Sequence, residues 1–277
     1  EPVWELAKWI KDLNFDLVDR ADVFCGQMAL GCATWVSSRS HRQKARPSHG
    51  LEARDAIIAV KTVGKFHSTR VVLLHEIWGK ASPVEMLYLS NESYSGEQGL
   101  EVIDLSPEFG DSVKPEVEST KSGSGHCAKM WAILEYLHRH HQGKRWYVVV
   151  DDDTLLNVRQ LLAVLDSHDD RKPLYVGERY GWAHREKYEG NNYITTGGGM
   201  AMTGKALTRL MQCDHCQCSS PDAPDDMALG TWFQRLNIPI LHEEGFHQSQ
   251  PRNFHPQVLR HSELPVSFHR YSENFPE

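Results

Sequence analysis

Short β-prone runs alternate with amphipathic stretches along most of this chain, from about residue 55 onward. Buried strands are predicted at residues 56–60, 84–89, 100–105, 146–150 and 174–176. Apolar positions spaced i, i+3, i+4 and i+7 predict a helix after the first of these strands, with a buried face made of Val71, Leu74, His75 and Trp78. This alternation is typical of an α/β, Rossmann-like domain whose mixed, mainly parallel sheet is flanked by helices.

Three later helices are predicted from the same kind of apolar stripe. The stripes are Cys127, Met130, Trp131, Leu134 and Leu137, then Val158, Leu161, Leu162 and Leu165, and finally Leu229, Trp232, Phe233 and Leu236. The second of these helices is expected to begin near Thr154 or Asn157. Residues 106–125 are rich in Ser, Gly, Pro, Glu and Lys, which favours a loop over a site. Ligands of open α/β sheets bind beyond the carboxyl ends of the strands, so the site is expected there.

Composition narrows the possible organisation and partners. The 277 residues, 40% hydrophobic and 24% charged, suffice for one large α/β domain. Residues 1–54 are expected to form an N-terminal stem or packing extension, with an amphipathic helix around residues 4–17, and residues 55–277 the main domain. A net charge of −7 and the lack of a basic, aromatic-rich stripe argue against nucleic acid as the main partner. No apolar run approaches the ~20 residues that span a bilayer, so membrane association is expected only through segments outside this chain.

Three adjacent carboxylates, Asp151, Asp152 and Asp153, follow the strand predicted at residues 146–150. Carboxylate oxygens are hard ligands suited to Mg²⁺ or Mn²⁺. Residues two apart in an extended segment point the same way, so Asp151 and Asp153 are expected to address one centre while Asp152 faces another. The simpler alternative is an Asp-rich turn that caps the following helix. From this motif alone, both interpretations stay open.

Other candidate residues lie later in the chain. The glycines Gly197, Gly198 and Gly199 interrupt an apolar, strand-like segment, where they serve either as a close approach to a ligand or as a plain turn. Asp225 and Asp226 open a predicted helix, where acidic residues are favoured by the helix dipole and where a general base could also sit. His247 could supply an imidazole to a metal held by Asp153, although sixteen histidines make a chance placement easy.

The six cysteines favour disulfides over zinc. Cys213, Cys216 and Cys218 are closely spaced, but no second ligand cluster completes a zinc site at the usual spacing. We expect disulfide bracing, with one partner further away. The sequon Asn91-Glu92-Ser93 is a concordant hint of a secretory compartment.

Several motifs, taken in chain order, resemble those of the Fringe-like β-1,3-glycosyltransferases. They are Ala59-Val60-Lys61-Thr62, Lys65-Phe66-His67 with Arg70 and Trp78, Val150-Asp151-Asp152-Asp153-Thr154, Thr196-Gly197-Gly198-Gly199, Pro224-Asp225-Asp226-Met227 and Phe246-His247. Other segments are most similar to family members that extend O-linked fucose on thrombospondin type 1 repeats, namely residues 125–129, 176–181, 222–227 and 266–269. The resemblance covers about residues 55–272, and the ordered set is more specific than any single motif.

This resemblance implies a GT-A fold for residues 55–277 and an inverting transfer from a UDP-sugar with Mn²⁺, or Mg²⁺, as cofactor. It implies that Asp153 ligates the metal directly, that His247 is the second protein ligand, and that Asp151 and Asp152 serve the metal shell and the nucleotide. Asp226, or less favourably Asp225, would be the catalytic base. The remaining donor-binding positions implied by it are Ala59, Lys61, Thr62, Arg70, Lys129, Gly197, Gly198 and Gly199.

The implied reaction is transfer of glucose from UDP-glucose to the 3-hydroxyl of O-linked fucose on glycoprotein repeats, in the secretory pathway and in the endoplasmic reticulum lumen rather than the Golgi. Three alternatives stay open. The first is a Fringe-type transfer of N-acetylglucosamine, a choice that residues around Gly197–Gly199 and Tyr180-Gly181-Trp182 could decide. The others are a non-catalytic sugar-binding relative and a metal-dependent phosphohydrolase.

Overall fold

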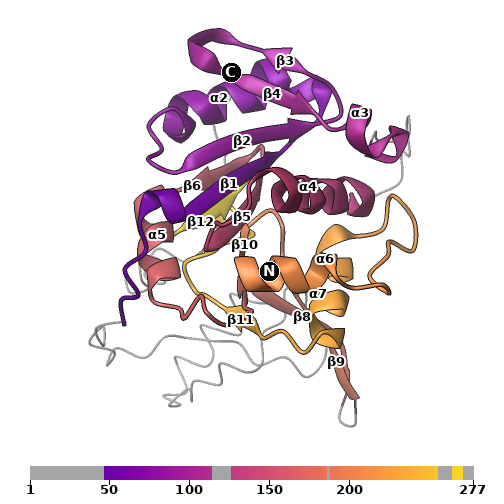
Figure 1. The fold of residues 1–277 in the computed structure, drawn as a ribbon. Coiled ribbons are helices and arrows are strands. Elements are labelled where there is room, and N and C mark those ends of the chain that lie inside the picture. Colours follow the sequence, from indigo (N-terminus) through magenta and orange to yellow (C-terminus); the bar gives the residue numbers. More distant parts are fainter. Residues whose placement is uncertain (1–46, 114–125, 186–187, 255–263, 271–277) are drawn as a thin grey trace.

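The computed structural model describes residues 47–113, 126–185, 188–254 and 264–270 (Figure 1). The helix expected around residues 4–17, two of the cysteines and most of the loop expected at residues 106–125 lie outside these ranges. Residues 48–51 already pack on the domain, because Ser48 donates to Asp166 at 2.6 Å and Leu51 donates to it at 2.7 Å. The boundary expected near residue 55 stays a prediction.

A sheet in the order β11-β7-β10-β5-β1-β2-β4-β3 forms the centre of the domain (Figure 1). Its strands are β1 (Ala56–Lys61), β2 (Glu85–Ser90), β3 (Tyr94–Ser95), β4 (Glu101–Asp104), β5 (Trp146–Asp151), β7 (Tyr175–Gly177), β10 (Met200–Thr203) and β11 (Ile240–His242). The pairs β1–β2, β1–β5, β2–β4 and β7–β11 are parallel, whereas β10 is antiparallel to both neighbours and β3 is antiparallel to β4. The mixed, mainly parallel sheet expected from the strand pattern is therefore confirmed.

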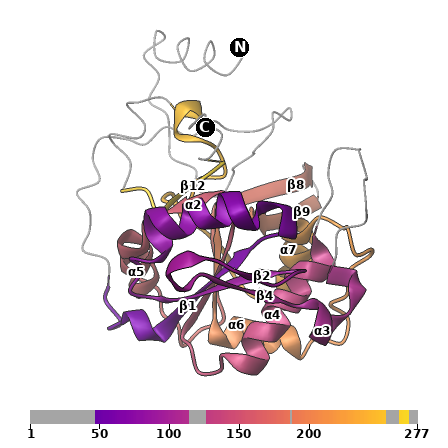
Figure 2. The same cartoon turned by 90° about the horizontal axis from the view of Figure 1, so that it is seen from above.

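Helices cover both faces of this sheet, as Figure 2 shows. One face carries α4 (Cys127–His140), α6 (Gly204–Met211) and α7 (Asp225–Arg235), which share a core with Ile57 and Val149. The other face carries α5 (Val158–Asp166) and a helical segment at His67–Gly79, whose centre is α2 (Val72–Leu74), and shares a core with Ile58 and Val148. Alternate strand residues thus feed two separate cores, as the period of two requires. The remaining short helix α3 spans Ser106–Phe109.

Of the two helix starts expected after the acidic triplet, the structure has the one at Asn157. Residues Thr154–Leu156 form a short strand, β6, which pairs with β12 (Ser267–His269) in a separate two-stranded sheet. The following helix α5 begins only after Asn157, whose side chain accepts a hydrogen bond from the Gln160 amide at 3.1 Å. Pairing with a strand more than a hundred residues away overrides the local helical pattern. This pairing brings the end of the chain's described part beside the triplet.

A second two-stranded sheet projects from the domain and consists of β8 (Arg179–Arg185) and β9 (Tyr188–Ile194). This hairpin packs against α7. Among the residues described, no helix is both long and apolar enough to cross a membrane.

Candidate functional site

The candidate residues from distant parts of the chain meet at one end of the central sheet. Lys61 ends β1 and Asp151 ends β5, and the two are direct partners in the parallel pair. The acidic turn, the glycine turn before β10 and the first turn of α7 all reach this end. It is the carboxyl end of the parallel strands, where α/β sheets bind ligands.

The three acids of the triplet have different partners. Asp152 accepts from the Thr62 hydroxyl at 2.7 Å and from Arg70 at 3.2 Å, while Asp153 accepts from Arg70 at 3.0 Å. Asp153 also lies 3.1 Å from Nε2 of His269. Burial raises the pKa of Asp152 to about 6, because the charged form loses water and faces two neighbouring carboxylates. Burial acts the same way on Asp153, but His269 and Arg70 outweigh it and hold the pKa of Asp153 below its usual value.

A group with the chemistry of a metal site includes Asp151, Asp153 and His269. One ligand atom from each lies within 4.8 Å of the others. Carboxylate oxygens suit both Mn²⁺ and Mg²⁺ when further positions are left to water or phosphate, and the imidazole nitrogen favours the transition ion Mn²⁺. The residues therefore fit the divalent ion that the family resemblance implies. Asp151 and Asp153 belong to this group and Asp152 does not. That Asp151 and Asp153 serve one metal centre stays a prediction.

His247, the second ligand expected from the sequence, does not join this group. Its Nδ1 lies 2.9 Å from the carbonyl oxygen of Ser267, and its ring stacks on Phe268 at 4.5 Å between centroids. His269 takes the place beside Asp153 instead. The segment ending at His269 was among the motifs that carried the family resemblance, but sequence reasoning gave it no role. Phe-His pairs occur at 66–67, 246–247, 254–255 and 268–269, so the sequence offered several histidines in the same local context and no means of choosing the one that faces the acids.

The glycine turn makes room for His269. A Cβ atom on Gly197 would lie 2.5 Å from the His269 ring, and the Gly198 amide donates to the Gln248 side chain at 2.8 Å. Gly199 has a φ of +89°, a conformation that favours glycine. The glycine turn thus has a structural role, because the lack of a side chain at Gly197 lets the backbone lie close to the imidazole of His269. Donor binding by the same turn stays a prediction.

Lys61 joins the acidic turn to α7. Its ammonium is 2.6 Å from Oδ2 of Asp225 and 3.1 Å from Oδ1 of Asp151, and the residue is only 7% exposed. Burial alone would lower the pKa of Lys61, but the two carboxylates raise it above its usual value, so the ammonium stays charged. Burial likewise disfavours charge on Asp225, yet Lys61 holds the pKa of Asp225 below its usual range. The buried cation is thereby matched by two anions.

Asp226 has a different environment from Asp225. Both oxygens of Asp225 are occupied, by Lys61 and by the Asp226 amide at 3.0 Å. One oxygen of Asp226 accepts from the Met227 amide at 2.7 Å, and the side chain is half-buried. Burial, followed by the negative charge of Asp225, raises the pKa of Asp226 to about 6. A half-exposed carboxylate with a pKa nearer neutrality is better suited to take a proton.

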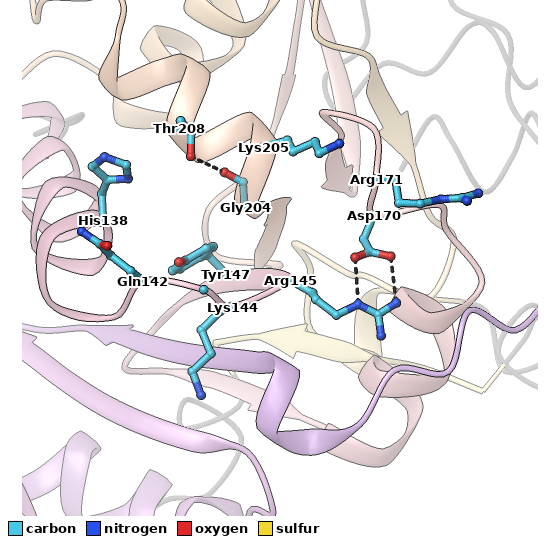
Figure 3. A pocket seen from close by; sticks show the side chains of 11 residues that line it. His138, Gln142, Lys144, Arg145, Tyr147, Asp170, Arg171, Gly204, Lys205 and Thr208 are labelled. Carbon is cyan, nitrogen blue, oxygen red and sulfur yellow. Dashed lines mark hydrogen bonds and ion pairs between the residues drawn. The ribbon is translucent and has the colours of Figure 1, made fainter.

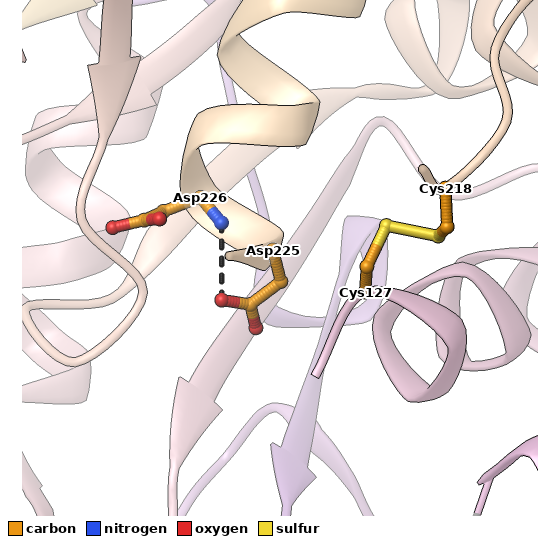
Figure 4. The surroundings of a disulfide bond; sticks show 4 residues. All are labelled: Cys127, Cys218, Asp225 and Asp226. Atoms are coloured by element: carbon orange, nitrogen blue, oxygen red, sulfur yellow. Dashed lines mark hydrogen bonds between the residues drawn. A yellow bond between two sulfur atoms is a disulfide. The ribbon is translucent and has the colours of Figure 1, made fainter. Parts of the chain in front are cut away.

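A disulfide braces the segment that leads into these two acids. Cys127, at the start of α4, is bonded to Cys218, and the Cys127 amide donates to the Ala223 carbonyl at 3.1 Å. Figure 4 shows the Asp225 and Asp226 side chains leaving the first turn of α7 in different directions near this disulfide. Cys213 pairs with Cys216, so the described residues contain no free cysteine. Disulfide bracing with one distant partner is confirmed, and the zinc alternative loses its ligands.

The other donor-binding candidates divide into two kinds. Lys129 donates to the Thr62 carbonyl at 2.9 Å and to the Asn91 side chain at 3.1 Å, close to the residues that contact Asp152. Ala59 instead has its side chain fully inside the core, so only its backbone could serve a ligand. Asn91 is 6% exposed and its side chain contacts Lys129, so the sequon at 91–93 gives no support for a glycan in this structure.

Two open cavities lie away from this site. One, of about 400 Å³, is at the amino end of β5, where Arg145 is bonded to Asp170 beside Lys144 and Lys205 (Figure 3). The other, of about 620 Å³, is lined by Trp131, Phe109 and the Cys213–Cys218 segment. Neither contains a residue of the acidic turn or of the first turn of α7.

Comparisons with known proteins point to one family. A family model described as Fringe-like matches residues 51–275. The chain is 37% identical to a human β-1,3-glucosyltransferase over 223 residues, which are 80% of this chain and 41% of that protein. It is 25% identical to the β-1,3-N-acetylglucosaminyltransferase lunatic fringe of Xenopus laevis, over 82% of this chain and 62% of the relative. Thus the chain spans less than half the length of the glucosyltransferase it matches.

A solved structure of the galactosyltransferase LgtC, in complex with donor and acceptor sugar analogues, is also similar. Its TM-score is 0.44 and its identity 12%, over 78% of this chain and 87% of that one.

Replacing Lys61 by methionine is expected to lower the free energy of unfolding by about 3–5 kcal/mol, because the buried Asp225 and the half-buried Asp151 would lose their cation. Urea unfolding followed by far-UV circular dichroism measures the change. The matched control is Arg171→Met, which removes a cation from an exposed pair with Asp169 and should change stability little. An equal and small effect of both substitutions would contradict the bridging role of Lys61.

Proposed function

Because the chain belongs to the Fringe-like family, we propose that it transfers glucose from UDP-glucose, with inversion, to the 3-hydroxyl of O-linked fucose on thrombospondin type 1 repeats. The observation that carries this proposal is the Lys61 bridge, since one ammonium ties Asp151 of the metal-fitting group to Asp225, the neighbour of a half-exposed acid. A metal-fitting group and a candidate base are thereby fixed at the same end of one sheet.

Asp226 is the proposed base. In a single displacement, the acceptor hydroxyl oxygen forms a bond to the anomeric carbon, the bond from that carbon to the diphosphate oxygen breaks, and Asp226 takes the hydroxyl proton. UDP leaves with the electron pair of the broken bond. With a pKa of about 6, Asp226 is still mostly ionised at neutral pH. The raised pKa also makes it a stronger base than an ordinary aspartate.

The donor side is assigned to the residues around the acidic turn. Asp151, Asp153 and His269 would hold Mn²⁺ or Mg²⁺, which when bound neutralises charge on the diphosphate. Arg70 already contacts both Asp152 and Asp153, and its guanidinium is a bidentate phosphate donor by its geometry. Lys129, with a pKa lowered to about 8 by burial and by Lys61, supplies a further cation on the same side.

The compartment proposed is the secretory pathway, and its endoplasmic reticulum lumen rather than the Golgi. Two disulfides within the described residues support an oxidising environment. The choice of lumen rests on the family resemblance alone.

The competing functions can be separated by the mass of the product. The protein is incubated with Mn²⁺, a panel of UDP-sugars and a fucosylated repeat. We expect a hexose increment with UDP-glucose. An N-acetylhexosamine increment would instead select the Fringe-type reaction, free phosphate without glycosylated product would select a phosphohydrolase, and binding without any increment would select a non-catalytic relative.

Substitution of the two adjacent acids separates the base from its neighbour. Asp226→Asn is expected to retain UDP and metal binding but to lose transfer by about 10²–10⁴-fold, the usual contribution of a general base. Asp225→Asn should keep measurable transfer, because an amide still accepts from Lys61. In the wild type, kcat should rise with pH through about 6, as Asp226 loses its proton. In Asp225→Asn this rise of kcat should occur at lower pH, since the negative charge next to Asp226 is gone. If Asp225→Asn loses transfer and Asp226→Asn does not, Asp225 is the base.

A matched pair of histidine variants tests the metal assignment. His269→Gln should weaken Mn²⁺ binding by tenfold or more, an effect of about 1.4 kcal/mol or larger, because the group loses its nitrogen ligand. His247→Gln should leave Mn²⁺ affinity unchanged, since its ring faces Ser267 and Phe268. Calorimetry on variants with wild-type circular dichroism measures both, and Asp153→Ala serves as the variant expected to lose metal-dependent UDP binding. The reverse pattern between the two histidines would restore His247 as the ligand.

A further inference from the structure

One face of α7 continues from Asp226 along the projecting hairpin. Asp226, Gly230 and Gln234 are four residues apart and so lie in one row on the helix. Gln234 accepts from the Asn192 amide at 3.4 Å and donates to the Gly190 carbonyl at 3.2 Å. A Cβ atom on Gly230 would lie 2.3 Å from the Asn192 carbonyl oxygen. Strand β9 therefore lies directly against this row and leads towards Asp226.

A pair of tyrosines stands on this hairpin next to the proposed base. Tyr193 of β9 is the strand partner of Tyr180 of β8, and their ring centroids are 6.1 Å apart with a tilt of 31°. Directly opposed residues of antiparallel strands have side chains on the same face. Both tyrosines are half-buried, so neither residue is wholly enclosed in the core. The Cβ of Tyr193 would be 2.5 Å from a Cβ on Gly230, one turn after Asp226.

The electrostatics of Tyr193 agree with this placement. Burial and then the negative charge of Asp226 raise the pKa of Tyr193. Its phenol therefore stays protonated at neutral pH and can donate a hydrogen bond. The Tyr180 hydroxyl donates to the Glu178 carboxylate at 3.4 Å, which gives the second ring a contact of its own.

We propose that Tyr193, supported by Tyr180, is the stacking platform for the acceptor monosaccharide and determines which sugar ring can present its hydroxyl to Asp226. This inference rests on the proposed function and adds the acceptor subsite to it. A pyranose exposes a face of C–H groups that packs on an aromatic ring, while a phenol hydroxyl can serve a sugar hydroxyl. A 6-deoxyhexose such as fucose offers additional apolar surface through its methyl group.

The position of the two tyrosines suits a contact with the acceptor sugar better than a contact with the donor. The groups that suit a diphosphate are Thr62, directly after β1, Arg70 in the segment at His67–Gly79, and Lys129 in α4. The tyrosines instead stand on the hairpin that packs against the helix carrying the base. In an inverting displacement, the acceptor approaches from the side opposite the leaving group, and the base must touch the acceptor hydroxyl.

The test uses Tyr193→Leu, which keeps apolar volume but removes the aromatic face, and Tyr193→Phe, which keeps the ring. Tyr136→Leu is the control, because Tyr136 is a half-buried tyrosine on α4 that packs on His140 away from the site. For each variant, KM is measured for a fucosylated repeat and for a simple aryl fucoside. Affinity for UDP with Mn²⁺, slow hydrolysis of the UDP-sugar without acceptor, and thermal unfolding are measured in parallel.

For Tyr193→Leu we expect KM to rise about tenfold or more for both acceptors, as loss of one aromatic contact predicts. UDP affinity and acceptor-free hydrolysis should stay at the wild-type level. Tyr193→Phe should restore most of the KM, and Tyr136→Leu should leave every value unchanged. A rise with the simple fucoside shows that the sugar ring, rather than the polypeptide, is the group contacted.

Three results would overturn the inference. An unchanged acceptor KM in folded Tyr193→Leu removes the platform, and an equal loss of UDP affinity assigns Tyr193 to general packing. If Tyr193→Leu does not fold, Tyr180→Leu replaces it, with a smaller KM increase expected and the same criteria. If the wild type transfers sugar to no acceptor, both the proposed function and the stacking platform are refuted. If the wild type transfers normally and Tyr193→Leu has the wild-type acceptor KM, the platform alone is refuted.

Discussion

The contact on which the candidate site depends is the buried ammonium of Lys61 between Asp151 and Asp225. The three residues come from β1, β5 and α7, and Lys61 and Asp225 are 164 positions apart in the chain. A buried cation is tolerated only when anions replace its lost water, and either carboxylate would be costly without it. The same contact therefore holds α7 against the end of the sheet and favours the ionised form of Asp225.

Other interactions at the site follow from this arrangement. With Asp151 turned towards Lys61 and His269, Asp152 meets Thr62 and Arg70, and Asp153 lies between Arg70 and His269. Asp225 is fully occupied, so the adjacent Asp226 is left with a raised pKa and a partly free carboxylate. Adjacent residues of identical type thus acquire different chemistry because each faces a different neighbour.

Local pattern was a good guide to the elements and a poor guide to their partners. Strands β1 and β5 are continuous apolar runs because both of their faces are buried. The helices at Val71–Trp78, α4 and α7 show apolar stripes because each of them buries one face only. The local pattern leaves the helix start open at Thr154 or Asn157 and gives no sign of strand β6, because β6 pairs with β12, more than a hundred positions later. The sequence likewise could not identify the histidine beside Asp153, since Phe246-His247 and Phe268-His269 have the same local pattern and only the fold brings one of them to the acids.

The sequence by itself determined the α/β sheet, the position of the acidic turn at a strand end, the adjacent acids opening α7 and the resemblance to one family. These features are local, since they depend on side-chain periodicity and on the order of short motifs. Only the tertiary structure decided that His269 rather than His247 lies beside Asp153, that the glycine turn makes room for that imidazole, and that Lys61 joins two acids. Each of these depends on which distant groups share a desolvated space, because burial and charge pairing act through distance in space and not through distance along the chain.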